Sequence, residues 1–291
     1  MGFKCGIVGL PNVGKSTLFN ALTKSSIPAE NFPFCTIEPN VGKVPLPDNR
    51  LKKLNDIVNS KKIIPASLDL VDIAGLVKGA SQGEGLGNAF LSNIREMNAL
   101  AHVVRCFEDE NITHVDGSID PVRDAEIINL ELIMSDLETV SKRILKCEKL
   151  LKTNDKKNKA EHEILIRIKN DLDQGKLINI EGFNEDERAI IKSFQLLSSK
   201  PTFYIANISD DGSSDDALNK LIEFANLSGN TVIPTSIKIE QEIAILDEEE
   251  RKEYLELMAM DDLVLNNIIF KGYQLLGLQT YFTAGPQERR A

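Results

Sequence analysis

The feature that most constrains this chain is the run Gly9-Leu10-Pro11-Asn12-Val13-Gly14-Lys15-Ser16-Thr17. Apolar residues precede it and apolar residues at helical spacing follow it, so the segment reads as a strand, a glycine loop and a helix. Gly9 and Gly14 let the backbone wrap closely around an anion, with successive N–H groups pointing inward at the mouth of a helix. The alternative, a chance glycine-rich turn, is disfavoured by this placement. The run predicts a phosphate-binding loop.

Two side chains of the loop predict nucleotide chemistry. Lys15 supplies a mobile positive charge for β- and γ-phosphates, and the Ser16 hydroxyl is a ligand for Mg²⁺. We therefore expect a nucleoside triphosphate site in which Lys15 also stabilises charge during the reaction. The nucleotide-binding residues predicted in this loop are Asn12, Val13, Gly14, Lys15, Ser16 and Thr17.

Two downstream segments predict the rest of the magnesium site. The irregular, proline-rich stretch from Ser25 to Gly42 is typical of a first switch segment, and Thr36 is its candidate ligand for Mg²⁺. The alternative for Thr36 is an ordinary exposed loop threonine. Further on, an apolar strand ends in Asp72-Ile73-Ala74-Gly75, which puts a carboxylate at the ligand-binding edge of a parallel sheet. We expect Asp72 to hold Mg²⁺ through water.

The group that positions the attacking water is less evident. Related Ras-like enzymes place a glutamine directly after the glycine of this motif. This chain has Leu76 there, at the start of a glycine-rich segment that we assign as the second switch. His102 lies inside an apolar strand and is expected to be a packed histidine. His114 lies in a polar connection and is the candidate for positioning water, the alternative being an ordinary surface histidine.

We expect the base-recognition residues at the end of a later segment of the sheet, Pro201–Asp210. It contains Asn207-x-x-Asp210, where guanine enzymes commonly have Asn-Lys-x-Asp. Ile208 replaces the lysine, which weakens guanine selection without abolishing it. Ser236 and Ile237 are expected to add backbone contacts to the base from the next loop.

Residues 126–199 lie between the motifs of the phosphate and magnesium site and the base-recognition motif. Their apolar residues recur at helical spacing and predict two long antiparallel helices and a third helix near Glu185–Leu197. Residues 1–125 and 200–277 then form one α/β domain, and 278–291 resemble the start of a β-rich unit that stops too soon to fold. Lysines gather at the predicted hairpin tip. They predict either an RNA-docking surface or a solvated helical face. They are Lys142, Lys146, Lys149, Lys152, Lys156, Lys157 and Lys159, and Arg143 adds to their positive charge.

Composition limits the remaining alternatives. The net charge of −10 argues against wrapping of nucleic acid by the whole surface, and we expect no DNA partner. Four scattered cysteines without a C-x-x-C pair favour reduced thiols over a disulfide framework or zinc site. No apolar run approaches membrane-spanning length, and the first strand starts too early for a signal peptide. We therefore expect no membrane partner and a cytoplasmic protein.

The motifs above, with Asn31-Phe32-Pro33-Phe34-Cys35-Thr36-Ile37-Glu38-Pro39-Asn40, Asp72-Ile73-Ala74-Gly75-Leu76-Val77-Lys78-Gly79-Ala80 and Tyr204-Ile205-Ala206-Asn207, closely resemble those of the YchF / Obg-like ATPase family. The resemblance covers essentially the whole chain. It implies a P-loop domain of the translation-factor class, a helical coiled-coil insertion, and a C-terminal TGS domain of β-grasp type, of which only the first residues are present.

The resemblance also implies activity and partners. It implies hydrolysis of ATP in preference to GTP, and association with the ribosome, at its large subunit. The family's base motif is usually Asn-x-x-Glu, so Asp210 is a departure that keeps GTP as an alternative. His114 matches a family histidine in a mobile loop. Asn12 matches a position that helps some relatives bind K⁺, which makes K⁺ a second candidate ion.

Together these features predict a slow, Mg²⁺-dependent ATPase that acts as a nucleotide switch on the ribosome. A GTP-specific switch of the same fold is the first alternative. The second alternative is a ribosome- or RNA-docking module in which hydrolysis is incidental.

Overall fold

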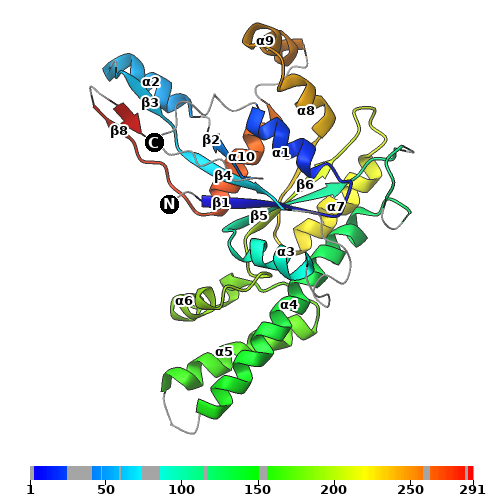
Figure 1. Ribbon diagram of the computed structural model, residues 1–291, viewed down its shortest axis with the longest axis vertical. Coiled ribbons are helices and arrows are strands. Elements are labelled where there is room, and N and C mark those ends of the chain that lie inside the picture. The colour runs from blue at the N-terminus through cyan, green and yellow to red at the C-terminus, as the bar shows by residue number, and fades with distance from the viewer. Residues whose placement is uncertain are drawn as a thin grey trace. The chain divides into compact units, whose positions relative to one another are not determined.

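The computed structural model describes residues 3–24, 41–46, 48–58, 60–73, 86–109, 111–114, 117–150, 156–257, 263–285 and 288–290 (Figure 1). The chain divides into two compact units. Unit 1 comprises Met1–Gly75, Met97–Val122 and Pro201–Ala291, and unit 2 comprises Leu76–Glu96 and Arg123–Lys200.

Unit 1 is built on a mainly parallel sheet. In the described part of the chain this sheet has six strands in the order β2-β4-β1-β5-β6-β7, and only β2 runs antiparallel to its neighbour. Strand β5 is buried along its whole length, which explains its unbroken apolar character. The predicted α/β fold with a mainly parallel sheet is confirmed. The strands are β1 (Phe3–Val8), β2 (Val41–Pro45), β4 (Ser67–Asp72), β5 (Ala99–Arg105), β6 (Thr202–Asn207) and β7 (Val232–Thr235).

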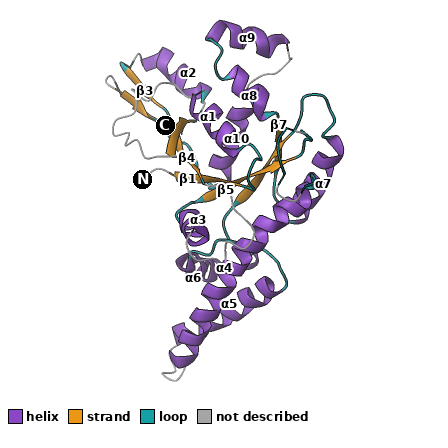
Figure 2. Cartoon of the chain, turned by 45° about the vertical axis from the view of Figure 1, so that its right-hand side comes forward, coloured by secondary structure: helices purple, strands orange, loops and turns teal. Residues whose placement is uncertain are grey.

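Helices cover both faces of this sheet. Neighbouring residues of β6 point to opposite faces: Phe203 lies near Gly272 of α10, and Tyr204 packs on Phe224 of α7 at a ring-centroid distance of 6.1 Å. Helix α1 lies on the same side as α10 (Figures 1 and 2). The described helices of unit 1 are α1 (Lys15–Lys24), α2 (Asn49–Val58), α7 (Asp215–Leu227), α8 (Ile237–Ile243), α9 (Glu248–Leu257) and α10 (Val264–Leu275).

Unit 2 contains the predicted helical insertion. Helices α4 (Pro121–Leu150) and α5 (Lys156–Asp173) lie side by side (Figures 1 and 2), and α6 (Glu185–Phe194) follows a short 3₁₀ turn at Ile180–Gly182. Helix α6 begins with a capping box between Asn184 and Glu187. These helices share one apolar core, made chiefly of Ile133, Val140, Ile144, Ile164, Leu165, Ile168, Leu172, Ile191 and Phe194.

The two units have other bounds than the predicted domains: the helical part of unit 2 starts at Arg123 rather than at residue 126, and unit 1 includes residues 278–291. Unit 2 also takes in residues 76–96, which the sequence-based prediction assigned to the nucleotide-binding domain. The described part of this stretch is residues 86–96, which contain α3 (Leu86–Arg95). The carbonyl of Arg95 accepts a hydrogen bond from Lys200 Nζ at 3.1 Å, which joins segments far apart in the chain. Such an interaction leaves no periodic trace in the sequence, so the pattern of apolar residues could not indicate it.

A second, small sheet joins the C-terminal segment to unit 1. Strand β9 (Glu288–Arg290) pairs in parallel with β3 (Lys62–Ile64) and antiparallel with β8 (Thr283–Ala284). The β-rich start predicted after residue 278 is thus present as strands, but one partner strand comes from the N-terminal part of the chain. That these strands begin a TGS domain remains a prediction.

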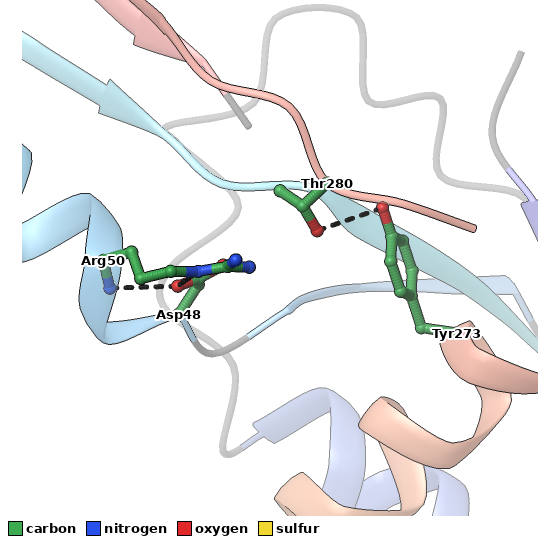
Figure 3. Close-up of polar contacts among 4 residues, drawn as sticks. All are labelled: Asp48, Arg50, Tyr273 and Thr280. Carbon is green, nitrogen blue, oxygen red and sulfur yellow. Dashed lines mark hydrogen bonds and ion pairs between the residues drawn. The ribbon is translucent and has the colours of Figure 1, made fainter.

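Figure 3 shows two polar contacts that involve α2, α10 and the C-terminal segment. The backbone N–H of Arg50 donates to Asp48 at 2.9 Å, and its guanidinium lies 4.9 Å from the ring centre of Phe282. The hydroxyl of Thr280 donates to the hydroxyl of Tyr273 at 3.4 Å. These contacts connect the start of α2 and the end of α10 with the C-terminal segment.

The described cysteines are buried and free, as expected of reduced thiols. They are Cys5, Cys106 and Cys147. Burial raises the pKa of the Cys5 thiol to about 12. None of the helices within the described ranges is long and apolar enough to cross a bilayer.

Within the helical unit, one buried carboxylate of α4 holds the segment that follows α6. Asp136 of α4 is fully buried and accepts from the backbone N–H groups of Leu197 and Ser198 at 2.9 and 2.8 Å and from the Ser198 hydroxyl at 2.6 Å. Asp136→Ala leaves these donors without an acceptor, so the free energy of unfolding should fall by about 3 kcal/mol. Urea denaturation followed by helical circular dichroism measures it.

The matched control is Asp173→Ala on α5. Asp173 forms an exposed ion pair with Lys169 at 2.6 Å, and its loss should change stability by less than about 0.5 kcal/mol. Equal effects of the two substitutions would contradict the assigned role of Asp136.

Candidate nucleotide-binding site

The phosphate-binding loop connects the end of β1 to the start of α1, as its sequence predicts. Two of its positions accept glycine alone. At Gly9, φ is +151° and a Cβ atom would lie 2.4 Å from the carbonyl oxygen of Val103. At Gly14, φ is +103° and a Cβ atom would lie 2.7 Å from Nδ2 of Asn207. The close packing of this loop on β5 and β6 therefore depends on these glycines.

Lys15 lies inside the loop and is only 7% exposed. Its Nζ donates to the carbonyl oxygen of Leu10 at 2.7 Å, so the loop backbone itself holds the ammonium group. Burial lowers the pKa of Lys15 to about 8, and the nearby charge of Asp72 opposes this shift. A polyanion brought to this loop would meet a desolvated cation, which attracts charge more strongly than an exposed lysine does.

The predicted magnesium ligands lie next to Lys15. Ser16 Oγ donates to Asp72 Oδ2 at 2.8 Å, and β1 and β4 bring these residues together because Ile7 pairs with Asp72 across the parallel ladder. The other oxygen of Asp72, Oδ1, is buried and has no hydrogen-bond partner among the described residues. A hydroxyl beside a carboxylate with an unused oxygen fits Mg²⁺, which binds oxygen ligands and keeps several waters. Thr36 lies outside the described residues.

The base-recognition segment meets the phosphate loop through Asn207. The side-chain Nδ2 of Asn207 donates to the carbonyl oxygen of Val13 at 3.0 Å, and Oδ1 accepts from the backbone N–H of Ile237 at 3.2 Å. The sequence-based prediction placed Ile237 in a loop that contacts the base. Instead Ser236 is the N-cap of α8 and Ile237 its first residue, so this N–H supports Asn207.

Asp210 is exposed at the end of this segment, while Ile208 is half-buried beside it. The loop that follows is held by Asp211, which the sequence-based prediction missed. Its carboxylate accepts from Ser209 Oγ at 2.6 Å and from the backbone N–H of Ser213 at 2.9 Å. These hydrogen bonds lower the pKa of Asp211 to about 2. An Asp followed by Gly212 and a serine is a turn signal that could have indicated this role.

The two histidines occupy different environments. His102 is 1% exposed in β5 and packs against Tyr204, with the two rings tilted by 36° and their centres 5.2 Å apart. Burial, with the charge of Lys15, lowers the pKa of His102 to about 3, so it is a neutral packed histidine, as expected. His114 is half-buried in the connection after β5. The residue before it, Thr113, accepts a hydrogen bond from Asn12 Nδ2 at 3.2 Å, which brings this connection to the phosphate loop.

Comparison with known proteins agrees with this geometry. A family described as 50S ribosome-binding GTPase matches residues 4–135. Ribosome-binding ATPase YchF of Escherichia coli O157:H7 is 51% identical over 292 residues, covering 100% of this chain and 80% of that protein. The Bacillus subtilis (strain 168) protein of the same name is 50% identical over 295 residues, covering 100% and 81%. The chain belongs to the YchF family.

A solved structure of a YchF protein has the same fold as this chain. The YchF GTPase of Schizosaccharomyces pombe is 39% identical, with a TM-score of 0.87 over 99% of this chain and 79% of that one. As a YchF protein, the chain is a P-loop nucleoside triphosphatase, which confirms the interpretation of the glycine loop. The structure brings together most of the predicted site, with Thr17 in the first turn of α1. The set that meets around the loop is Asn12, Val13, Gly14, Lys15, Ser16, Asp72, Asn207 and Ile237.

The buried ammonium of Lys15 predicts a pH-dependent nucleotide affinity in this YchF protein. Its pKa of about 8 in the free protein means that Lys15 loses its proton as the pH rises above 8, whereas a bound triphosphate favours the protonated form. Binding above pH 8 should therefore take up a proton, and affinity should fall by up to about tenfold per pH unit. Titrations between pH 7 and 9.5, with calorimetry in two buffers of different ionisation enthalpy, measure both effects.

The control variant is Lys15→Arg, whose guanidinium stays charged over this range. Its affinity should be lower overall but independent of pH above 8. A wild-type affinity that is also flat between pH 8 and 9.5 would show that Lys15 remains charged in the free protein.

Proposed function

We propose that this protein is a slow, Mg²⁺-dependent ATPase that works as a nucleotide switch on the ribosome, at its large subunit. The observation that carries the proposal is the buried Lys15 beside the Ser16–Asp72 pair, in a chain half identical along its whole length to proteins named ribosome-binding ATPases. The matching family described as 50S ribosome-binding supports the large subunit. The same resemblance supports a cytoplasmic location.

The residues have distinct roles in this proposal. Lys15 and the backbone amides of residues 12–17 stabilise the charge that develops on the β- and γ-phosphate oxygens. Ser16 and Thr36 would hold Mg²⁺ directly and Asp72 would hold it through water. The bound ion would neutralise phosphate charge. Asn12 would contact K⁺ where that ion assists.

His114 positions the attacking water, since Leu76 replaces the usual glutamine. Without a glutamine or an arginine finger, turnover by the protein alone should be about 10⁻⁴–10⁻² s⁻¹. A rate of tens per second for the isolated protein would contradict this mechanism.

GTP is the second candidate substrate, because Asp210 is the residue type that accepts hydrogen bonds from guanine N1 and N2. The relatives' names do not decide this, since they include both ATPases and a GTPase. In the proposal, the missing lysine at Ile208 and the exposed position of Asp210 leave guanine with few contacts, so ATP binds at least as tightly as GTP.

Competition between ATP and GTP for one fluorescent nucleotide analogue tests the base preference. In wild type, ATP should compete at least as well as GTP. Asp210→Glu should shift the ratio of the two affinities further towards ATP by about tenfold, the value of one good hydrogen-bonding pair. Asp211→Glu, which alters a neighbouring carboxylate that faces Ser209 and Ser213, is the control for general loop damage. A wild-type preference for GTP of a hundredfold or more would make the protein a GTPase.

The lysines near the tip of the α4–α5 hairpin favour docking on ribosomal RNA through unit 2. Changing the four exposed lysines Lys146, Lys149, Lys157 and Lys159 to Gln should weaken ribosome binding. The slope of log affinity against log salt concentration should also become less steep, by about 0.7–0.9 for each phosphate that is no longer neutralised. Sedimentation with ribosomes at several salt concentrations measures both.

The control makes the same charge change on unit 1, at the exposed residues Lys53, Lys61, Lys220 and Lys252. This variant should keep the wild-type salt dependence. If the hairpin variant keeps it as well, the docking surface lies elsewhere. The docking-module alternative gains support if two results are found together: the hairpin variant loses ribosome binding, and a variant that cannot hydrolyse ATP still functions in the cell.

A further inference from the structure

The connection that carries His114 is folded around a buried arginine. Arg105, the last residue of β5, is 2% exposed. Its guanidinium donates to three backbone carbonyls: Nε to Phe107 at 3.0 Å, Nη1 to Ile112 at 3.0 Å and Nη2 to Asp109 at 3.2 Å. Because the guanidinium is planar and rigid, these three acceptors are held in a fixed arrangement relative to β5.

Further contacts strengthen this arrangement. The guanidinium carbon of Arg105 lies 4.7 Å from the ring centre of Phe107. The carbonyl of Asp109 also accepts from the N–H of Ile112 at 3.2 Å, and its carboxylate accepts from the N–H of Asn111 at 2.9 Å. The described residues from 107 to 112 thus form a compact turn around one cation.

The end of this turn contacts the phosphate loop. Ile112 accepts from Arg105, and the next residue, Thr113, accepts from Asn12 Nδ2 at 3.2 Å. His114 follows immediately. The two backbone carbonyls before His114 are therefore held from two sides, by the end of β5 and by the phosphate loop.

We propose that Arg105 is a positioning residue for His114. The inference rests on the proposed function, in which His114 positions the attacking water. Arg105 acts through the carbonyls of residues 107–112, which set where the chain reaches the phosphate loop. A lysine at this position keeps the charge but offers a single flexible ammonium, which cannot hold three acceptors in one plane. The loop would then lose its fixed position while the phosphate loop itself stays intact.

The test compares Arg105→Lys, His114→Ala and the double variant in steady-state ATP hydrolysis. Because a displacement of ~1 Å costs as much as a hundredfold in rate, Arg105→Lys should lower kcat by about ten- to a hundredfold. KM and the affinity for a non-hydrolysable ATP analogue should stay within about twofold of wild type. In the His114→Ala background the same change should lower kcat by less than about twofold, because no histidine remains to be misplaced.

Arg188→Lys is the matched control. Its guanidinium also joins two backbone carbonyls, those of Phe183 at 2.7 Å and Glu181 at 2.9 Å, but in unit 2. It should leave kcat unchanged. Phe107→Leu is a second route that keeps Arg105 itself. It removes the ring next to the guanidinium and should lower kcat by less than Arg105→Lys does. This fall should again be absent in the His114→Ala background. The variant keeps the inference testable if Arg105→Lys does not fold.

The outcomes separate the two proposals. If His114→Ala keeps the wild-type kcat, the role of His114 in the proposed function is wrong, and its positioning by Arg105 fails with it. If His114→Ala lowers kcat but Arg105→Lys has no effect, or has the same effect in both backgrounds, only the inference about Arg105 is overturned.

Discussion

The side-chain amide of Asn207 connects the two parts of the nucleotide site. It donates to the carbonyl of Val13 and accepts from the N–H of Ile237, although Val13 and Asn207 are 194 residues apart in the chain. The amide can approach this closely because Gly14 has no side chain. One residue thereby fixes the phosphate loop relative to the first turn of α8. Groups held in place before the nucleotide arrives need not be ordered by it, which favours binding.

The charges around the loop follow from the same packing. Lys15 is desolvated, and its ammonium is held by the carbonyl of Leu10, while Asp72 and Ser16 face each other. His102 is buried in the neighbouring strand and stays neutral, so it adds no competing positive charge beneath the loop. A triphosphate with a divalent ion would complete this arrangement, because it supplies negative charge for Lys15 and a cation for the unused oxygen of Asp72.

Local chemistry made much of this site predictable from the sequence. The glycine loop, the carboxylate at the end of β4 and the helical insertion all have strong local patterns, and the structure has them where expected. The prediction was weaker where interactions between residues far apart in the chain determine the local structure. Ile237, which was expected in a loop, is instead the first residue of α8, and its N–H donates to Asn207. A buried arginine such as Arg105 has no distinguishing pattern either, since its acceptors are backbone carbonyls.

The pairing of β3 with β9 in the small sheet affects the order in which the chain folds. Strand β3 lies between β2 and β4 in the sequence, yet its partner β9 is among the last described residues, and the nearby hydrogen bond from Ser60 to Gly285 spans 225 residues. Pairing across so long a loop carries a large entropic cost and comes late in folding. During synthesis, the N-terminal strands emerge long before β9 exists. A nascent chain therefore cannot pair β3 with β9 until residues 288–290 have left the ribosome that made them.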